Sequence, residues 1–244
     1  MVDTHCHLDL CEEGALERAR EAGVSHIATI GMNPESIATA LDLAGANDDV
    51  FAIVGVHPNE AAGFDQATRE EVRERAGADR VVAIGETGLD YYRDRAPRDD
   101  QRRSFEAHLG LASELGLPVV IHTRQAEADT FDVLRGFDGT VILHCFSSPA
   151  RIDECIERRY ICSFAGNVTY DKSRDLQRAA KAIPDDMLLV ETDAPFLSPQ
   201  PVRGKPNEPG NVTHTARLVA ELRGVDYDEL DALVERNAAR VFGW

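Results

Sequence analysis

The amino-acid sequence predicts an α/β fold, a single (β/α)₈ TIM barrel. Three observations lead to this prediction. The chain has 244 residues, which is close to the roughly 250 residues of one such barrel. Short apolar runs recur along the chain, and each is followed by a charged, amphipathic segment with helix signals. Because we see no linker, internal repeat or low-complexity segment, we expect one domain that spans residues 1–244.

Eight apolar runs are the predicted strands. Their continuous Val, Ile and Leu content is typical of parallel strands that are buried on both faces. In chain order they cover residues 2–5, 24–31, 50–58, 80–88, 118–124, 140–146, 160–167 and 187–195. Strict alternation with helices favours a parallel sheet. An open doubly wound sheet is the alternative, although no glycine-rich phosphate-binding fingerprint follows the first strand.

The helices between these strands carry recognisable start and stop signals. Asn33 followed by Pro34 predicts a capped start, and the segment 147–159 predicts a start of the same kind. The longest helix is expected within residues 96–116, where Gly116 and then Pro118 end it. The tail 211–244 is predicted to form an eighth helix and two short helices that close the barrel.

Composition excludes some classes of protein. The net charge is −17 and the isoelectric point is about 4.8, which argues against a broad basic surface for phosphate groups. Only three of the 26 basic residues are lysine. An acidic chain with scarce lysine is typical of a salty cytoplasm, where a Debye length of about 3 Å at 1 M salt screens self-repulsion. The alternative is an ordinary acidic mesophilic enzyme.

The cysteine pattern and the apolar segments predict a cytoplasmic protein. The chain starts without a basic region followed by an apolar run, and no stretch reaches the roughly 18 apolar residues of a membrane span. Its five cysteines are odd in number and form no C-x-x-C pair. Free thiols in a reducing compartment are therefore expected.

Potential metal ligands gather at one end of the predicted strands. The stretch "VDTHCHLDL" places two histidines one residue apart, so both face the same side if the strand is extended. Similar residues follow the later strands; the full set is His5, His7, His57, Glu86, His122, His144 and Asp193. Each alone has a plainer explanation, a core histidine or a helix N-cap. Together they mark the carboxyl-terminal rim, where (β/α)₈ barrels form their active sites.

The number of these ligands predicts two metal ions. Without His57, which is a candidate substrate contact, the set holds four imidazoles and two carboxylates. These exceed the shell of one tetrahedral ion, whereas they suit two ions about 3.5–4 Å apart. Glu86 is the central candidate for a bridge, because no lysine falls on a predicted strand: Lys172 and Lys181 fall in a predicted helix and Lys205 in a late loop. Imidazole-rich ligands suit Zn²⁺, Mn²⁺ or Co²⁺ better than Mg²⁺. The sequence does not fix which divalent ion is bound.

The chain resembles the TatD-type metal-dependent deoxyribonucleases of the amidohydrolase-like barrel superfamily. The resemblance covers nearly the whole chain and is carried by "DTHCHLD", "GVHP", "AIGETGLDYY", "PVVIHTR", "LHCFS", "ETDAPFL", "RGKPNEP" and "NAARVF". It implies one ion on His5, His7, Glu86 and Asp193, and a second on Glu86, His122 and His144. Two positions depart from the family pattern, Thr87 and Ser148, and neither is a ligand.

The resemblance implies a reaction and a substrate. It implies hydrolysis of phosphodiester bonds by an activated water, with single-stranded DNA as the substrate and RNA as the alternative, cleaved in an exonuclease-like manner. Glu86 and Asp193 are the predicted catalytic residues, Asp193 as the group that orients the water and accepts its proton. We expect neither a membrane nor an obligate protein partner.

Substrate contacts are predicted near the same rim. Arg124, Arg203 and Lys205 are candidate phosphate contacts, with surface salt bridges as the alternative, and His57 points at the mouth of the barrel. Tyr91 and Tyr92 are either base-stacking or packing residues. Two other functions stay open. One is an amidohydrolase or esterase, including a lactonase or an editing deacylase for aminoacyl-tRNA, and the other is a non-enzymatic scaffold, which the complete ligand set disfavours.

Overall fold

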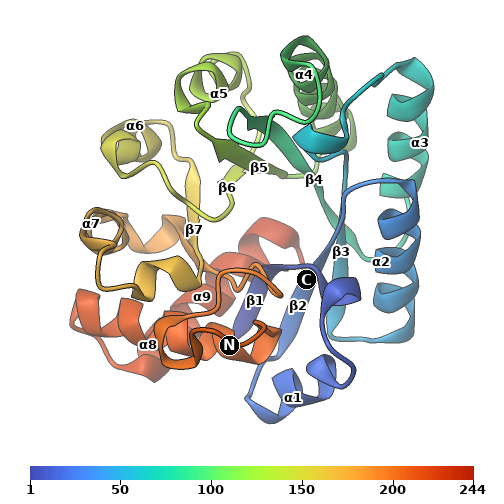
Figure 1. Cartoon of the computed structure of the whole chain (residues 1–244). Helices are drawn as coiled ribbons and strands as arrows, with labels where there is room; N and C mark the ends of the chain where they lie inside the picture. Colours follow the sequence, from blue (N-terminus) through green and yellow to red (C-terminus); the bar gives the residue numbers. More distant parts are fainter. The chain divides into compact units, whose positions relative to one another are not determined.

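Eight parallel strands, one from each predicted apolar run, pair in chain order in one sheet (Figure 1). The computed structural model describes all residues 1–244. The strands are β1 (Val2–Cys6), β2 (His26–Gly31), β3 (Val50–Val54), β4 (Val81–Asp90), β5 (Val119–Arg124), β6 (Val141–Leu143), β7 (Ile161–Phe164) and β8 (Leu188–Val190). This order is the topology predicted for a (β/α)₈ barrel. The doubly wound alternative is wrong, because such sheets reverse their strand order at a switch point.

The chain forms two compact units. Unit 1 contains residues 1–29 and 144–244, and unit 2 contains residues 30–143. Within unit 2, β4 pairs with β3 and with β5 in parallel. Within unit 1, β7 pairs with β8. Every residue of β1 is buried, as are all residues of β7 and β8, which explains the continuous apolar character of these runs.

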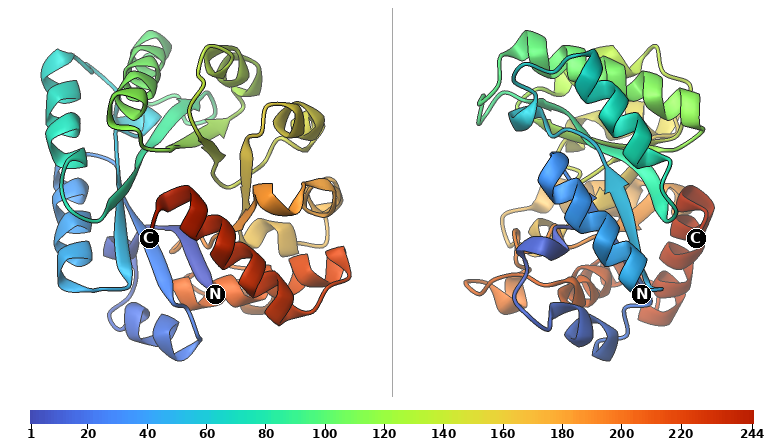
Figure 2. Two further views of the ribbon diagram at one scale, coloured as in Figure 1. Left: turned by 180° about the vertical axis from the view of Figure 1, so that it is seen from behind. Right: turned by 90° about the vertical axis from the view of Figure 1, so that its right-hand side faces the viewer.

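A helix follows each strand, and a ninth helix ends the chain. The α-helices are α1 (Ala15–Glu21), α2 (Pro34–Ala46), α3 (Gln66–Ala76), α4 (Arg98–Leu115), α5 (Glu127–Leu134), α6 (Ile152–Glu157), α7 (Arg174–Ala182), α8 (Val212–Arg223) and α9 (Tyr227–Phe242). In unit 2, α2 and α3 lie side by side in both views (Figures 1 and 2). In unit 1, α9 contacts β1 and β8.

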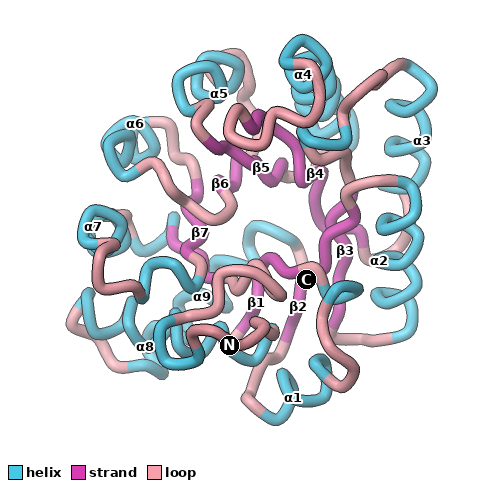
Figure 3. Tube along the Cα trace, in the orientation of Figure 1, coloured by secondary structure: helices cyan, strands magenta, loops and turns pink.

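Short 3₁₀ helices occupy several of the connections. They are η1 (Leu8–Leu10), η2 (Pro58–Glu60), η3 (Pro149–Arg151), η4 (Gly166–Thr169), η5 (Asp185–Met187), η6 (Gln200–Val202) and η7 (Pro209–Asn211). Figure 3 shows the long connection from β8 to α8, which the last two of these helices interrupt. This connection matters for the site because Asp193 lies near its start.

Some predicted helix ends are confirmed. The Asn33 side chain caps α2 by accepting the Ser36 backbone N–H at 3.0 Å, and the Ser36 hydroxyl oxygen accepts the Asn33 backbone N–H at 3.1 Å. Gly116 ends α4 in the left-handed conformation with φ 67°, which glycine adopts without a steric penalty.

Three other predictions are wrong. The segment 147–159 starts as the 3₁₀ helix η3 and its Ser148 makes no capping bond. The tail forms two long helices, α8 and α9, in place of one helix and two short ones. Lys172 lies in a turn before α7 and not in a helix. Terminal residue signals alone do not fix where a helix starts or how long it is, because most helical stability comes from tertiary packing.

A buried histidine fixes the end of β3 just before His57. His108 on α4 is fully buried, and its Nδ1–H donates to the Ser104 carbonyl at 2.7 Å. Its Nε2 then accepts the Val56 backbone N–H at 3.0 Å. Burial lowers the pKa of His108 to about 4, so the ring is neutral at pH 7. The chain leaving β3 is thereby attached to α4 one residue before a candidate site residue.

None of the helices combines the length and the apolar composition that crossing a bilayer requires.

Candidate metal centre

In unit 1, one carboxylate meets two imidazoles. His5 lies on β1, His7 directly follows it, and Asp193 follows β8. The Asp193 Oδ1 atom lies 3.8 Å from His5 Nε2 and 3.5 Å from His7 Nε2. The backbone positions this carboxylate, because the Asp193 N–H donates to the His5 carbonyl at 2.9 Å. Asp193 has φ 55°, a conformation that aspartate tolerates better than most residues.

The electrostatics of this cluster favour an ionised carboxylate. Burial by itself would raise the pKa of Asp193, but the nearby His7, His144 and His5 imidazoles outweigh it, and the pKa lies below its ordinary value. His144 belongs to the same surroundings, since its ring stacks on that of His5 with centroids 3.7 Å apart. Unit 1 therefore brings together His5, His7, His144 and Asp193.

Two further buried carboxylates in unit 1 hold these groups in place, and the sequence did not single them out. Glu191 is fully buried and accepts bonds from His144 Nδ1 and from the Cys145 backbone N–H, both at 2.8 Å. Asp3 is also fully buried and accepts the Thr192 backbone N–H at 2.8 Å. Burial raises the pKa of Asp3 well above its ordinary value, against the opposing effect of its bonds with Thr192. Such partners orient ligands and select a histidine tautomer.

In unit 2, a second cluster surrounds Glu86. His122 Nδ1 lies 2.6 Å from Glu86 Oε1, and His57 Nε2 lies 3.7 Å from the same oxygen. The other ring nitrogen of His57 accepts the Asn59 backbone N–H at 3.0 Å, which turns Nε2 toward the carboxylate. Glu86 and His122 both lie within their strands and not at the ends as predicted, because β4 continues to Asp90 and β5 to Arg124.

Asp90 completes this cluster and was missed. Its Oδ2 lies 3.4 Å from His122 Nε2 and 2.9 Å from Asn59 Nδ2, and its Oδ1 accepts the Arg93 backbone N–H at 2.8 Å. Burial would raise the pKa of Asp90, but these bonds outweigh it and lower the pKa well below its ordinary value. The signal was present, because Glu86 and Asp90 are two carboxylates at an even spacing along one strand.

Glycines bring β4 against β5 at this cluster. Gly88 has φ 138°, and a Cβ atom there would lie 2.0 Å from the His122 carbonyl oxygen. Gly85 has φ 144°, and a Cβ atom there would lie 2.6 Å from the Val120 carbonyl oxygen. No other residue fits either position without moving the strands. The close approach places Glu86 beside His122.

The plainer explanations for these residues do not hold. Neither Glu86 nor Asp193 is the N-cap of a helix, since Pro97 precedes α4 and Asn211 precedes α8. His122 and His144 bond to carboxylates, where a structural core histidine was expected to bond to the backbone. Groups of imidazole and carboxylate atoms that lie within 4.8 Å of one another occur in each unit: His5 with His7 and Asp193, and His57 with Glu86 and His122.

The spacing of these donor atoms fits divalent ions. Ligand atoms about 2.1 Å from a tetrahedral ion lie roughly 3.4 Å apart. The separations of 3.5 and 3.8 Å around Asp193, and of 3.7 Å between His57 and Glu86, are near this value, whereas the 2.6 Å between His122 Nδ1 and Glu86 Oε1 is a hydrogen-bond distance. The longer separations are long for hydrogen bonds between nitrogen and oxygen. Nitrogen and oxygen donors of this kind suit Zn²⁺, Mn²⁺ or Co²⁺.

Most of the predicted substrate contacts already have partners. The Arg124 guanidinium stacks on Tyr92 at 3.9 Å from the ring centroid, and the Arg203 guanidinium stacks on Tyr170 at the same distance. The Tyr91 hydroxyl donates to Asp129 at 2.7 Å, and the Arg98 guanidinium lies 3.9 Å from the centroid of its ring. Lys205 is exposed, and its carbonyl accepts the Ser198 hydroxyl at 2.6 Å.

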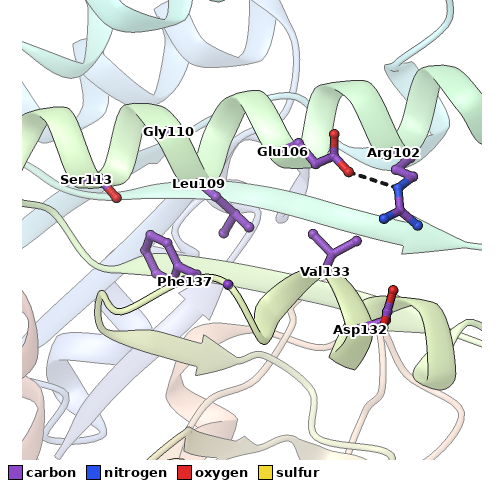
Figure 4. Close-up of a pocket in the computed structure, with 9 residues that line it drawn as sticks. Arg102, Glu106, Leu109, Gly110, Ser113, Asp132, Val133 and Phe137 are labelled. Carbon is purple, nitrogen blue, oxygen red and sulfur yellow. Dashed lines mark hydrogen bonds and ion pairs between the residues drawn. The ribbon is translucent and has the colours of Figure 1, made fainter.

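A groove elsewhere in unit 2 takes no part in this site. It has a volume of about 420 Å³ and lies between α4 and α5, where Leu109, Val133 and Phe137 face it and Arg102 pairs with Glu106 (Figure 4). None of the predicted site residues lines it. The groove is therefore separate from the candidate metal ligands.

Comparisons with known proteins agree with the resemblance in the sequence. The family model described as "TatD related DNase" matches residues 2–243. An uncharacterized metal-dependent hydrolase, TatD of Mycobacterium tuberculosis, is 40% identical over 100% of this chain and 98% of its own. The protein named 3'-5' ssDNA/RNA exonuclease TatD of Pectobacterium carotovorum is 38% identical, covering 94% of this chain and 92% of its own.

Solved structures confirm the predicted fold class. The TatD homologue YJJV of Escherichia coli superposes with a TM-score of 0.93 at 29% identity, over 100% of this chain and 98% of that one. A TatD family hydrolase of Entamoeba histolytica gives a TM-score of 0.88 at 20% identity, over 99% and 97% of the two chains, and supports the fold alone. The chain is a (β/α)₈ TIM barrel and belongs to the TatD-related DNase family of metal-dependent hydrolases.

Proposed function

We propose that this protein is a metal-dependent nuclease that hydrolyses phosphodiester bonds in single-stranded DNA from an end of the strand. The observation that carries the proposal is the position of the Asp193 carboxylate, 3.5 Å from His7 Nε2 and 3.8 Å from His5 Nε2. A relative that is 38% identical is named as a 3'-5' exonuclease on single-stranded DNA and RNA, which supports a single-stranded nucleic acid as the substrate.

We propose that the chain holds two divalent ions. His5, His7 and Asp193 would hold one ion, and Glu86 and His122 would hold the other. The family resemblance adds His144 to the second ion and makes Glu86 the carboxylate that both ions share. Their donor chemistry favours Zn²⁺, Mn²⁺ or Co²⁺. When bound, such ions supply Lewis acids that polarise the phosphate and lower the pKa of a water molecule toward 7.

Asp193 is the proposed proton acceptor. Its lowered pKa keeps the carboxylate ionised at neutral pH, so it can orient a water molecule and take its proton. The His5 carbonyl bond to the Asp193 backbone holds this carboxylate against β1. Glu86 is the second proposed catalytic carboxylate, and its bond with His122 at 2.6 Å fixes its direction.

The substrate contacts are Arg124, Arg203, Lys205 and His57. A net charge of −17 repels a polyanion, so local positive charge at the site must attract it. All three cations are exposed, and Lys205 is the most available of them because both arginines rest on tyrosine rings. We propose that the arginines keep these positions and present their guanidinium edges to phosphate groups.

Two smaller proposals accompany this function. One family model spans residues 2–243, which supports a single domain over 1–244. None of the five cysteines forms a disulfide, and three of them are buried, which supports work in the reducing cytoplasm.

The proposal is tested with purified protein and single-stranded DNA labelled at either the 3′ or the 5′ end. Metal-stripped protein is assayed with Zn²⁺, Mn²⁺, Co²⁺ and Mg²⁺ in turn. We expect labelled mononucleotides from the 3′-labelled strand and a ladder of shortening products from the 5′-labelled strand. Absence of cleavage with every metal, in protein shown to bind the metal, would refute the proposal. An aminoacyl ester substrate in parallel tests the esterase alternative.

A further inference from the structure

We propose that Phe196 is a base-stacking residue, a flat apolar surface that binds the nucleobase next to the phosphate under attack. The inference rests on the proposed nuclease function and adds to it a specific binding residue. It concerns only residues of unit 1.

Phe196 is exposed where other phenylalanines are buried. Its side chain is 49% exposed, whereas Phe105, Phe131, Phe146 and Phe164 are fully buried. The molecule exposes few large apolar side chains, and the other two are Leu10 and Tyr92. An exposed phenyl ring contributes less to folding than a buried one, so folding alone does not account for this position.

The exposed ring lies beside the candidate metal ligands. Phe196 follows Asp193 by three residues, and its ring meets that of His7 edge to face, with centroids 5.8 Å apart at 70°. A nucleotide carries its base one sugar away from its phosphate. A phosphate held at His7 and Asp193 therefore places a base within reach of Phe196.

The backbone that carries this ring is fixed although the ring is exposed. The Phe196 N–H donates to the Asp193 carbonyl at 2.8 Å. The buried Asn207 amide donates to the Phe196 carbonyl at 2.7 Å and to the Thr192 carbonyl at 3.0 Å. The turn is thus tied to the end of β8. A rigid aromatic side chain loses little entropy when it binds a flat partner.

The chemistry of phenylalanine selects the kind of ligand. A phenyl ring offers no hydrogen bond, so it cannot read a base edge, but every base has a face that stacks on it. Tyr92, the other exposed aromatic residue, already stacks with the Arg124 guanidinium. Phe196 therefore suits binding of single strands without a strong sequence preference.

The test compares single-stranded oligonucleotides with normal bases to the same oligonucleotides with abasic sites scanned through the last three positions of the 3′ end. Stacking on one aromatic ring accounts for about a 5- to 150-fold effect. For the wild-type protein we expect a loss of this size in kcat/KM at one abasic position. In Phe196→Ala the ratio between normal and abasic substrates should fall toward one, and in Phe196→Trp it should return. Fluorescence anisotropy with metal-free protein measures the same ratio as dissociation constants.

Leu10→Ala is the matched control, because Leu10 is equally exposed, at 50%, and has no flat ring. It should keep the wild-type ratio. Phe196→Leu keeps an apolar side chain without a ring, and provides the test if Phe196→Ala does not fold. A ratio in Phe196→Ala or Phe196→Leu equal to that of the wild type would overturn the inference. Failure of the wild-type protein to cleave either substrate would instead refute the proposed function.

Discussion

The Nε2 atom of His7 lies 3.5 Å from the Asp193 carboxylate, across the space between the ends of β1 and β8. This relationship joins a histidine that follows the first strand to an aspartate that follows the last. It is the arrangement from which the proposed proton transfer and one of the proposed metal sites both follow.

Asp193→Asn should remove most of the turnover while leaving the fold intact. Asparagine keeps the shape but cannot accept the proton of a water molecule, and loss of a general base costs about 10²- to 10⁴-fold in rate. The measurement is kcat on single-stranded DNA at saturating metal. Asp132→Asn, which changes an exposed aspartate on α5, is the control. Near-wild-type turnover by Asp193→Asn would show that the base lies elsewhere.

Glu86→Ala should lose bound metal. The sequence predicts that Glu86 is shared by two ions, so its removal should release both. Metal content after dialysis measures this loss. Glu106→Ala, on the exposed face of α4, is the matched control. Retention of about two ions per chain by Glu86→Ala would contradict a bridging role.

Stability should fall between pH 7 and pH 5 because of His108. Its pKa is lowered to about 4 in the folded protein, against about 6.5 in the unfolded chain. Below pH 6.5 His108 is therefore protonated in the unfolded chain but stays neutral in the folded protein, so the free energy of unfolding decreases as the pH falls. The contribution of this one group is about 2 kcal/mol between pH 7 and pH 5.

His108→Gln removes this titration while keeping an acceptor for the Val56 N–H. The free energy of unfolding in urea, measured at both pH values, should fall less in the variant than in the wild type. An equal fall in both proteins would mean that His108 is protonated in the folded state.

Gly88→Ala should destabilise the protein by more than about 2 kcal/mol, since a side chain at positive φ costs roughly 1–3 kcal/mol before any clash. Its Cβ atom would lie 2.0 Å from the His122 carbonyl oxygen. Gly110→Ala is the control, because its Cβ atom meets nothing within 4 Å and alanine favours a helix. Urea unfolding of both variants gives the comparison. Equal stability of Gly88→Ala and the wild type would contradict the close approach of β4 to β5.

Salt should raise the melting temperature. Screening relieves the repulsion of a chain with a net charge of −17, and the Debye length falls to about 3 Å at 1 M salt. With few basic contacts to DNA, the loss of affinity in salt should also be shallow. Thermal unfolding between roughly 0.1 and 2 M KCl covers this screening range. A flat or falling melting temperature would indicate an ordinary acidic enzyme.

Much of this fold could be predicted because buried parallel strands leave a direct record in the sequence. The eight apolar runs gave the strands, although β8 proved to be only Leu188–Val190. Asp193 therefore lies in the following loop. The apolar run also continued past the last ladder bond in β3, so His57 follows the strand and does not end it. An apolar run shows which residues are buried, and buried residues such as Val56 continue past the last hydrogen-bonded residue of the strand, so the run alone places the strand end too late.

The carboxylates that support the site could not be predicted in the same way. Asp3 and Glu191 flank predicted ligands, but their role depends on which neighbouring strand their side chains reach. Asp90 was missed although its spacing from Glu86 was visible, because the predicted run ended at residue 88 and β4 continues to Asp90. The cation–aromatic pairs of Arg124 with Tyr92 and of Arg203 with Tyr170 likewise join residues that are far apart in the sequence.

One measurement tests the central claim most directly. Metal-stripped protein is titrated with Zn²⁺ or Mn²⁺ while bound metal and release of the 3′-terminal nucleotide from single-stranded DNA are followed in the same samples. We predict no release without metal, and release that rises with metal binding and reaches its maximum near two ions per chain. Release that persists in excess chelator, or fully loaded protein that releases no nucleotide, would contradict a metal-dependent nuclease.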